Sequence, residues 1–282
     1  MIDPEAIRRA VRAALDEDIG PGDLTSRLTI DESARAKGDI VAREDLVVAG
    51  LPVAREVFGQ VDGTLEFSAR CEDGERRTTG DVCATIEGPA RSILAGERTA
   101  LNFMQRLCGI ATAARRAVDS LGGARVQIAA TRKTAPGLRA LDKHAVEIGG
   151  GVAHRQGLFD AVLIKDNHWR LCGGIENAIA TARARMAREG RALPIEIEAG
   201  TLDEVREALR ARADAILLDN MPRPLLEEAV AAARGRAFLE ISGGVREEDI
   251  PALARLGVDR ISLGSLTHSV RAADLALELS AR

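Results

Sequence analysis

The sequence predicts an α/β fold in which the second part of the chain builds a parallel sheet. From Ala124 onward, short runs rich in β-branched and other apolar residues alternate with segments of helical periodicity. This alternation is typical of repeated strand–helix units, which place helices on a sheet of parallel strands. The residues before this region follow another pattern, in which Gly and Pro separate short apolar stretches, and they indicate a mixed unit.

The first unit should begin with a helix over roughly Pro4–Asp16 and continue with β-like stretches such as Asp39–Gly50. From Gly88 to Val118 apolar residues recur at helical spacing, which predicts one or two helices leading out of this unit. We therefore predict two domains, over residues 1–108 and 109–282.

The second domain should contain six strands, each followed by a helical pattern. These strands are expected at Val126–Thr131, Ala161–Lys165, Pro194–Ala199, Asp214–Asp219, Ala237–Ser242 and Asp259–Gly264. Thr201 and Glu204 have the spacing of a capping box at the start of one helix. Six strand–helix units are fewer than the eight of a complete α/β barrel.

Composition excludes several functional classes. Thirty-nine basic and 43 acidic residues give a net charge of −4, so the chain lacks the basic excess of a nucleic-acid-binding protein. Aromatic residues make up 2% and tyrosine is missing, which argues against a stacking surface for single-stranded nucleic acid. No apolar run approaches the ~20 residues of a membrane span, so we expect no membrane partner and a cytoplasmic protein.

The four cysteines have neither the paired spacing of a zinc site nor the density of a disulfide scaffold. We expect all of them to be reduced thiols in the core. They are Cys71, Cys83, Cys108 and Cys172.

Cations lie at the ends of several predicted strands. They are Arg132, Lys133, His154, Arg155 and Lys165. In parallel α/β folds ligands bind at the carboxyl ends of the strands, so these side chains should meet there. Arg fits carboxylate or phosphate with a planar fork and Lys acts as a point charge, which predicts a polyanionic ligand. Each cation taken alone could be a solvated surface charge, and Lys165 could instead form a Schiff base.

Two small-residue loops close strands ahead of helical patterns, at Ser242–Gly244 and Leu263–Ser265. Glycine lets backbone N–H groups approach a phosphate closely, and a helix N-terminus favours negative charge. The alternative is an ordinary strand-to-helix turn.

Glu198 and Asp219 end two further strands and are the carboxylates in register with these cations. They could hold Mg²⁺, accept hydrogen bonds from ribose hydroxyls, or stabilise positive charge at a sugar carbon. They could also act only as ion-pair partners of Lys133 and Lys165. Without a catalytic triad or a Walker-type loop, the residues alone indicate an anion-handling α/β enzyme.

The stretch TRKTAPGLRALDKHAVEIGGGVAHRQGLFDAVLIKDNH closely resembles the signature of the quinolinate phosphoribosyltransferases. The resemblance continues in EDIGPGDLTS, GERTALNFMQRLCGIAT, IEIEAGTLDEV, ILLDNM, SGGV and DRISLGSLTHSV, and so covers nearly the whole chain in order.

The resemblance implies an N-terminal α/β sandwich domain and a C-terminal incomplete parallel α/β barrel. It also implies transfer of phosphoribosyl from phosphoribosyl pyrophosphate to quinolinate with decarboxylation, with Mg²⁺ as cofactor. The family forms a homodimer with a shared active site, and hexamers built from such dimers are left open.

Residue roles follow from the same resemblance. Quinolinate carboxylates are assigned to Arg98 from the neighbouring subunit and to Arg132, His154 and Arg155, while Lys133 and Lys165 lie near both substrates. Glu198 and Asp219 match the acids beside the ribose and its Mg²⁺. The 5′-phosphate site matches Ser242, Gly243, Gly244 and Gly264, and the remaining substrate positions are Thr131, Leu263, Ser265 and His268.

Two positions depart from the commonest family pattern. Ala130 stands where an aspartate is frequent, and Ala153 replaces the usual asparagine before His154. Neither change removes a cation or carboxylate that the chemistry needs. Three alternatives remain: a molybdenum-associated paralog, a nicotinate phosphoribosyltransferase that does not decarboxylate, and a non-catalytic anion-binding protein on the same fold.

Overall fold

The computed structural model describes residues 2–281, and the side chains of residues 2–280, as two compact units, each assembled from separate stretches of the chain. The first unit comprises the residues up to Arg116, Thr134–Gly150 and the residues from Leu266 onward, and the second comprises Ala117–Lys133 and Gly151–Ser265. This division differs from the single boundary expected between residues 108 and 109. One helix, α4, runs across that point from Ala90 to Asp119.

The first unit combines an antiparallel sheet with helices. Its four-stranded sheet has the order β12-β1-β5-β3, and a small second sheet pairs β2 with β4. The strands are β1 Arg35–Ala42, β2 Leu46–Val47, β3 Glu66–Ala69, β4 Arg76–Arg77, β5 Val82–Pro89 and β12 Leu275–Ala281. The helices are α1 Pro4–Asp18, α2 Leu24–Thr29, α3 Leu51–Val61, α4, α5 Arg139–Ile148 and α11 Ser265–His268.

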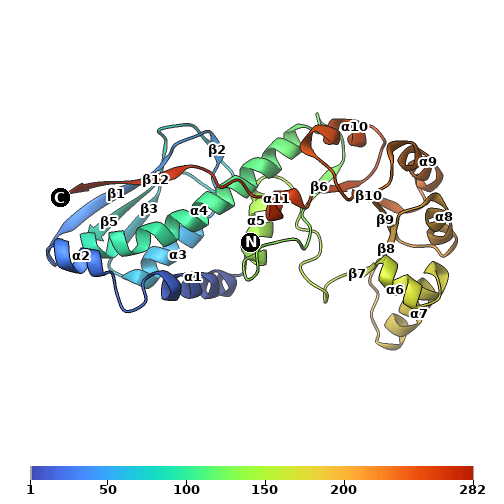
Figure 1. Ribbon diagram of the computed structural model, residues 1–282, viewed down its shortest axis with the longest axis horizontal. Coiled ribbons are helices and arrows are strands. Elements are labelled where there is room, and N and C mark those ends of the chain that lie inside the picture. Colours follow the sequence, from blue (N-terminus) through green and yellow to red (C-terminus); the bar gives the residue numbers. More distant parts are fainter. Residues whose placement is uncertain (1, 282) are drawn as a thin grey trace. The chain divides into compact units, whose positions relative to one another are not determined.

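The C-terminal strand completes this unit. In Figure 1, β12 in red lies beside β1 in blue, and the two are paired antiparallel from Ala36 opposite Ala281 to Ala42 opposite Leu275. The expected N-terminal helix is confirmed. Asp3 caps α1, because its side chain accepts a hydrogen bond from the backbone N–H of Glu5.

The second unit is an open, six-stranded parallel sheet with the order β6-β11-β10-β9-β8-β7. All six expected strands are confirmed: β6 Gln127–Ala129, β7 Val162–Ile164, β8 Ile195–Ala199, β9 Ala215–Asp219, β10 Phe238–Ser242 and β11 Arg260–Ser262. β6 and β7 lie at opposite ends of this order and do not pair with each other. The unit is therefore an incomplete α/β barrel, as expected.

Helices cover one face of this parallel sheet. They are α6 Asp166–Leu171, α7 Ile175–Arg188, α8 Leu202–Arg210, α9 Arg223–Ala233 and α10 Ile250–Ala254, the last preceded by the 3₁₀ turn η1 Glu247–Asp249. The expected capping box of α8 is present. Thr201 Oγ1 accepts from the N–H of Glu204, and the Glu204 carboxylate accepts from the N–H of Thr201.

Strand alternation gives the sheet one apolar face and one polar face. Residues that point toward the helices are apolar and at most 4% exposed, for example Ile197, Leu218 and Ile241. Because successive side chains point to opposite faces, their neighbours Glu198, Asp219 and Ser242 share the other face. The polar face is thus fixed by the same pattern that builds the core.

The structure also bears on the expected burial of the cysteines and on membrane-spanning helices. All four cysteines are free, but only Cys83 and Cys108 are buried, while Cys71 is half-buried and Cys172 is exposed. Cys172 lies just after the short surface helix α6 and therefore has no core to enter. Within residues 2–281, no helix is both long enough and apolar enough to cross a membrane.

Candidate active site

A cavity of about 480 Å³ opens on the polar face of the second unit, at the carboxyl ends of its strands. This volume lies within the usual range of small-molecule sites. Eleven of the residues expected at the site line it: Thr131, Arg132, Lys133, His154, Arg155, Lys165, Glu198, Asp219, Ser242, Gly243 and Gly244. The structure therefore brings most of the predicted site residues together in one cavity.

Backbone pairing at the edge of the sheet places His154 and Arg155. Val152 forms a parallel bridge with Ala129 of β6, because its N–H donates to Ile128 and its carbonyl accepts from Ala130. The chain then turns through His154, whose φ of 53° is left-handed. Ala130, which departs from the commonest family pattern, is fully buried at this edge and uses its N–H in the bridge.

Two guanidinium groups meet in the cavity. Burial lowers the pKa of Arg155, and the neighbouring Arg132 guanidinium lowers it further. The like charges therefore lie close enough to repel each other, which disfavours two cations side by side. An anionic ligand between them would relieve that repulsion.

Lys165 and Glu198 form an ion pair at the mouth of the cavity. Lys165 Nζ lies 2.9 Å from Glu198 Oε2, and the side chains are 46% and 13% exposed. The expectation that a carboxylate would neutralise a cavity lysine is confirmed for this pair. Asp219, on the adjacent strand β9, instead accepts a hydrogen bond of 2.8 Å from the Asn220 amide.

The Ser242–Gly244 loop shows why glycine is needed at this strand end. Gly243 and Gly244 have φ values of 90° and 60°, in the left-handed region that side chains disfavour. A Cβ on Gly243 would also lie 2.4 Å from the Asn220 side chain. Contrary to expectation, no helix starts directly after this loop. The next element is η1, whose three residues are all acidic.

The second small-residue loop differs from the first. Leu263, Gly264 and Ser265 follow β11, but they are not among the described residues that line the cavity. The helix that begins at Ser265, α11, has only four residues and ends at His268. Its N-terminus therefore supplies little of the dipole that was expected to favour a phosphate.

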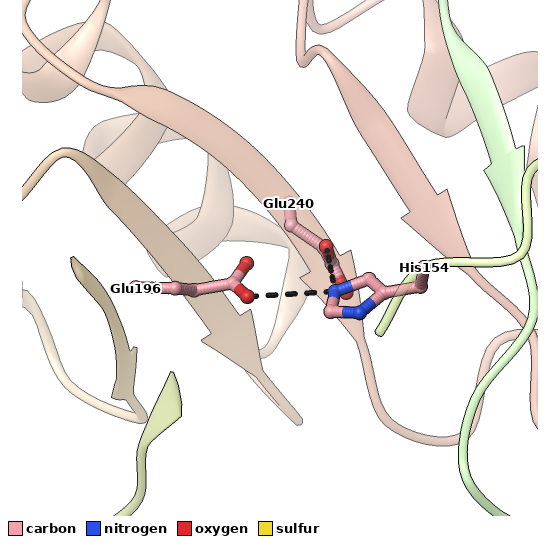
Figure 2. A group of neighbouring side chains, drawn as sticks. All are labelled: His154, Glu196 and Glu240. Carbon is pink, nitrogen blue, oxygen red and sulfur yellow. Dashed lines mark hydrogen bonds and ion pairs between the residues drawn. The ribbon is translucent and has the colours of Figure 1, made fainter. Parts of the chain in front are cut away.

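Sequence analysis missed a buried cluster at the base of the cavity. His154 Nε2 lies 3.1 Å from Glu240 Oε2 and 3.4 Å from Glu196 Oε2 (Figure 2). The two acids come from β10 and β8, and they are only 1% and 9% exposed. The sequence did contain an indication of these two acids. Glu196 and Glu240 each stand two residues before a predicted site residue, and residues two apart in a strand share one face.

The pKa values of the three groups in this cluster shift for different reasons. Burial raises the pKa of Glu196, and the nearby Glu240 carboxylate adds to that rise. Burial also opposes ionisation of Glu240, but hydrogen bonds and charges from His154, Ser262 and Arg260 lower its pKa overall. Burial alone would lower the pKa of His154, whereas the two carboxylates raise it to about 9.

A contact at the other ring nitrogen opposes that rise. The backbone N–H of Arg155 donates to His154 Nδ1 at 2.6 Å, which requires a lone pair there. In the neutral ring the proton therefore sits on Nε2 and faces the carboxylates, whereas a charged ring carries a second proton on Nδ1 and loses the Arg155 contact. Both nitrogens of His154 are occupied within the protein.

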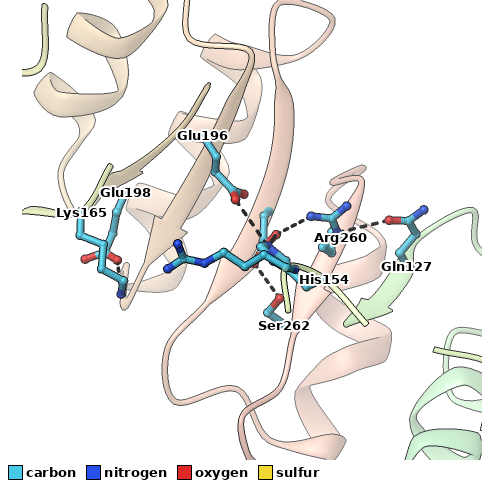
Figure 3. A network of polar contacts seen from close by, with 9 residues as sticks. Gln127, His154, Lys165, Glu196, Glu198, Arg260 and Ser262 are labelled. Atoms are coloured by element: carbon cyan, nitrogen blue, oxygen red, sulfur yellow. Dashed lines mark hydrogen bonds and ion pairs between the residues drawn. The ribbon is translucent and has the colours of Figure 1, made fainter. Parts of the chain in front are cut away.

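The cluster extends along β11 (Figure 3). Arg260 Nη1 donates to Glu240 Oε2 at 3.0 Å, and Ser262 Oγ donates to Glu240 Oε1 at 2.6 Å. Arg260 also donates to Gln127 Oε1 at 3.2 Å, which links β11 to β6. Four strands thus contribute polar side chains to one network on the polar face of the sheet.

Two expected site residues belong to the first unit. Arg98 is exposed on α4. His268 is exposed at the end of α11, where its Nδ1 lies 2.7 Å from Ser269 Oγ.

Comparison with known proteins identifies the family of the chain. Residues 110–278 match the model of the quinolinate phosphoribosyl transferase C-terminal domain, and residues 23–108 match that of the N-terminal domain. The chain belongs to the quinolinate phosphoribosyltransferase family.

Curated relatives share this family assignment across most of their length. A protein of Bacillus subtilis named probable nicotinate-nucleotide pyrophosphorylase (carboxylating) is 41% identical over 94% of this chain and 90% of its own. A chloroplastic nicotinate-nucleotide pyrophosphorylase (carboxylating) of Oryza sativa is 42% identical over 97% of this chain and 77% of its own.

Solved structures of the family superpose closely. The nicotinate-nucleotide pyrophosphorylase of Francisella tularensis is 37% identical with a TM-score of 0.94, covering 99% of this chain and 98% of its own. The human nicotinic acid phosphoribosyltransferase is 15% identical with a TM-score of 0.61, over 92% of this chain and 72% of its own. This second likeness concerns the fold alone.

Proposed function

We propose that this cavity transfers phosphoribosyl from phosphoribosyl pyrophosphate to quinolinate and releases carbon dioxide, which yields nicotinate mononucleotide for NAD biosynthesis. One observation carries the proposal: a single cavity brings two arginines and two lysines together with Glu198 and Asp219. Two polyanionic substrates need this number of cations, and a sugar carbon that develops positive charge needs a carboxylate nearby.

Arg132 and Arg155 are assigned to the carboxylates of quinolinate. A guanidinium can bind a carboxylate through two parallel hydrogen bonds, which fixes the ring as well as its charge. Two adjacent guanidiniums match a substrate with two adjacent carboxylates, whereas nicotinate carries only one. The family resemblance implies that His154 also binds these carboxylates, but both of its ring nitrogens already have partners in the protein, which favours an indirect role.

The phosphoribosyl substrate is assigned to the opposite wall. The backbone N–H groups of Ser242–Gly244 would hold its 5′-phosphate, since glycines at left-handed φ expose the backbone to a ligand. Thr131, Leu263, Gly264, Ser265 and His268 remain proposed contacts of this substrate.

The donor set fits Mg²⁺. Glu198 and Asp219 present hard carboxylate oxygens at the ends of adjacent strands, and Mg²⁺ prefers one or two carboxylates together with substrate phosphates. When bound, Mg²⁺ would supply Lewis-acid stabilisation of the pyrophosphate oxygens. Lys165 already neutralises Glu198, so the protein keeps this carboxylate paired before substrates arrive.

The reaction follows from these positions. The pyridine nitrogen attacks the anomeric carbon while pyrophosphate leaves, and Lys133 and Lys165 stabilise the departing negative charge. Glu198 and Asp219 face the sugar carbon as it gains positive character. The quaternary ring nitrogen then accepts the electrons released when the adjacent carboxylate leaves as carbon dioxide, and the ring carbon takes up a proton. This last step needs mainly positioning.

We further propose a homodimer in which Arg98 of one protomer reaches the cavity of the other; assembly into hexamers is a separate question. The family resemblance, in which Arg98 matches an arginine supplied across the subunit interface, supports the idea. Mixing Arg98→Ala chains with Lys165→Ala chains should restore activity, because one of the two mixed sites would then be intact. If the mixture stays as inactive as each parent, the shared site is wrong.

We propose a cytoplasmic location, supported by four free thiols, since reducing compartments keep cysteines unpaired.

The deciding experiment measures products. Purified protein is incubated with phosphoribosyl pyrophosphate, Mg²⁺ and either quinolinate or nicotinate, and products are identified by mass while carbon dioxide is collected. Nicotinate mononucleotide with equimolar carbon dioxide, from quinolinate alone, is the expected result. Product from nicotinate without carbon dioxide would move the assignment to a non-decarboxylating enzyme. No product from either substrate would favour a molybdenum-associated paralog or a binding protein, and Asp219→Asn serves as the inactive control.

A further inference from the structure

Glu240 is a carboxylate on which donors from two other parts of the chain converge. It is 1% exposed, in the middle of β10. Ser262 and Arg260 reach it from β11, and His154 reaches it from the turn beside β6 (Figure 3). A buried charge of this kind is stable only when its hydrogen bonds are complete, so the positions of its donors are tightly coupled.

The turn at His154 needs such a support. A left-handed φ is uncommon outside glycine, and it persists where surrounding contacts hold it. Glu240 holds the ring at Nε2, while Nδ1 accepts the N–H of Arg155. The imidazole therefore connects the buried carboxylate to the backbone of Arg155.

Arg155 in turn needs to be held against repulsion. Burial opposes the charge of its guanidinium, and the nearby charge of Arg132 opposes it further. The carboxylates of Glu196, Asp160 and Glu198 favour the charged form of Arg155.

A metal ion is the competing explanation for His154, Glu196 and Glu240, whose ligand atoms lie within 4.8 Å of one another. A metal-bound nitrogen must be unprotonated. Since His154 Nδ1 accepts a hydrogen bond, the proton of the neutral ring sits on Nε2, the atom that would have to bind the metal. Arg260 also approaches the same oxygen of Glu240, which a cation would repel.

We propose that Glu240 is a positioning residue that holds the His154–Arg155 turn and so aims the Arg155 guanidinium at a carboxylate of quinolinate. The inference rests on the proposed function for the identity of that carboxylate. Glu240 touches no substrate in this account, and its effect passes through His154 and Arg155.

The test compares Glu240→Met with Glu240→Gln. Methionine has a similar shape but only a weakly accepting sulfur and no charge, so His154 and Arg260 lose the carboxylate that they share. Its KM for quinolinate should rise by about tenfold or more, the usual effect of losing a residue that orients a ligand-binding group. Glutamine keeps a carbonyl oxygen for these donors and can donate to Ser262, so its KM should rise only about threefold. In both variants the KM for phosphoribosyl pyrophosphate should stay near that of the wild type.

Two controls separate positioning from general damage. Glu207→Gln disturbs a carboxylate that caps α7 in the same unit, at 3.0 Å from the N–H of Ile175, and should leave both KM values unchanged. Glu240→Met combined with Arg155→Ala should have the quinolinate KM of Arg155→Ala alone, since effects carried by one residue are not additive. If the two effects multiply, Glu240 does not act through Arg155.

An unchanged quinolinate KM in Glu240→Gln and in Glu240→Met would overturn the proposal, and the Gln variant alone decides if the Met variant does not fold. Crystal structures of the variants provide a readout without turnover. In Glu240→Met the φ of His154 should leave the left-handed region and the Arg155 guanidinium should move. An undisturbed turn contradicts the inference even in an inactive protein, whereas failure of the wild type to use quinolinate contradicts only the proposed substrate.

Discussion

Replacing Arg106 by methionine removes one side of a buried ion pair in the first unit. Arg106 on α4 donates to both carboxylate oxygens of Asp142 on α5, at 2.8 and 2.7 Å. The Asp142 side chain is completely buried and that of Arg106 is 26% exposed. Asp142 also accepts from the N–H of Ala135, and Arg106 donates to the carbonyl of Thr267. The pair therefore joins three separate stretches of the chain.

The expected loss can be estimated from these contacts. Breaking a buried ion pair on one side costs about 3 to 5 kcal/mol, because the remaining charge has no partner. Asp142 keeps the N–H of Ala135, so we expect the lower end, about 3 kcal/mol. At about 2 to 4 °C per kcal/mol for domains of comparable size, the Tm should fall by roughly 6 to 12 °C.

Thermal unfolding followed by circular dichroism measures this change. The double variant Arg106→Met/Asp142→Leu is the control, because it removes the stranded charge as well as its partner. It should be no less stable than Arg106→Met, since replacing both partners by apolar groups is often neutral. If the Tm of Arg106→Met lies within about 2 °C of the wild-type Tm, the change in unfolding free energy is less than about 1 kcal/mol and the argument is refuted. The argument is also refuted if the stability lost by the double variant equals the sum of the losses of Arg106→Met and Asp142→Leu.

Three further predictions concern the cavity. Arg132→Ala should weaken quinolinate binding by about 2 to 3 kcal/mol, or roughly 30- to 150-fold by calorimetry, and unchanged affinity would remove Arg132 from the site. Gly243→Ala should cost about 1 to 3 kcal/mol in backbone strain and displace Asn220, which raises the KM for phosphoribosyl pyrophosphate; an unchanged KM and Tm would contradict this. The raised pKa of His154, about 9 against an ordinary 6.5, means that its stabilisation is complete below pH 6.5 and is lost as the pH rises to 9. The difference in unfolding free energy between wild type and His154→Gln should therefore shrink over that range, and a difference independent of pH would argue against the shift.

Local patterns were sufficient to predict the strands and most of the cavity. The run Pro194–Ala199 alternates apolar and acidic residues, and β8 places Ile195 and Ile197 in the core with Glu198 on the polar face. Successive side chains of a strand point to opposite faces, so the apolar residues that face the core determine which residues lie on the other face. Because parallel strands end at one edge, Lys165, Glu198 and Asp219 had to meet.

The buried cluster depended on contacts that the chain order does not reveal. Glu240 lies in mid-strand among apolar residues, where one acidic residue gives no indication of its partner. Its partners are 86 residues away at His154 and about 20 away on β11. Only the strand order β11-β10-β9-β8, and the bridge that brings Val152 beside β6, decide which donors reach this carboxylate.

The sequence by itself determined the fold class, the six parallel strands and the residues that end them, because these follow from local periodicity. Tertiary structure alone decided how separate stretches join into units. β12 pairs with β1 although the two are far apart in the chain, and Arg106 of α4 holds Asp142 of α5 across 36 residues. It also decided that both ring nitrogens of His154 contact protein groups, Glu240 and the backbone N–H of Arg155. Such pairings depend on which surfaces are left to bury after the local elements have formed, and that is a property of the whole fold.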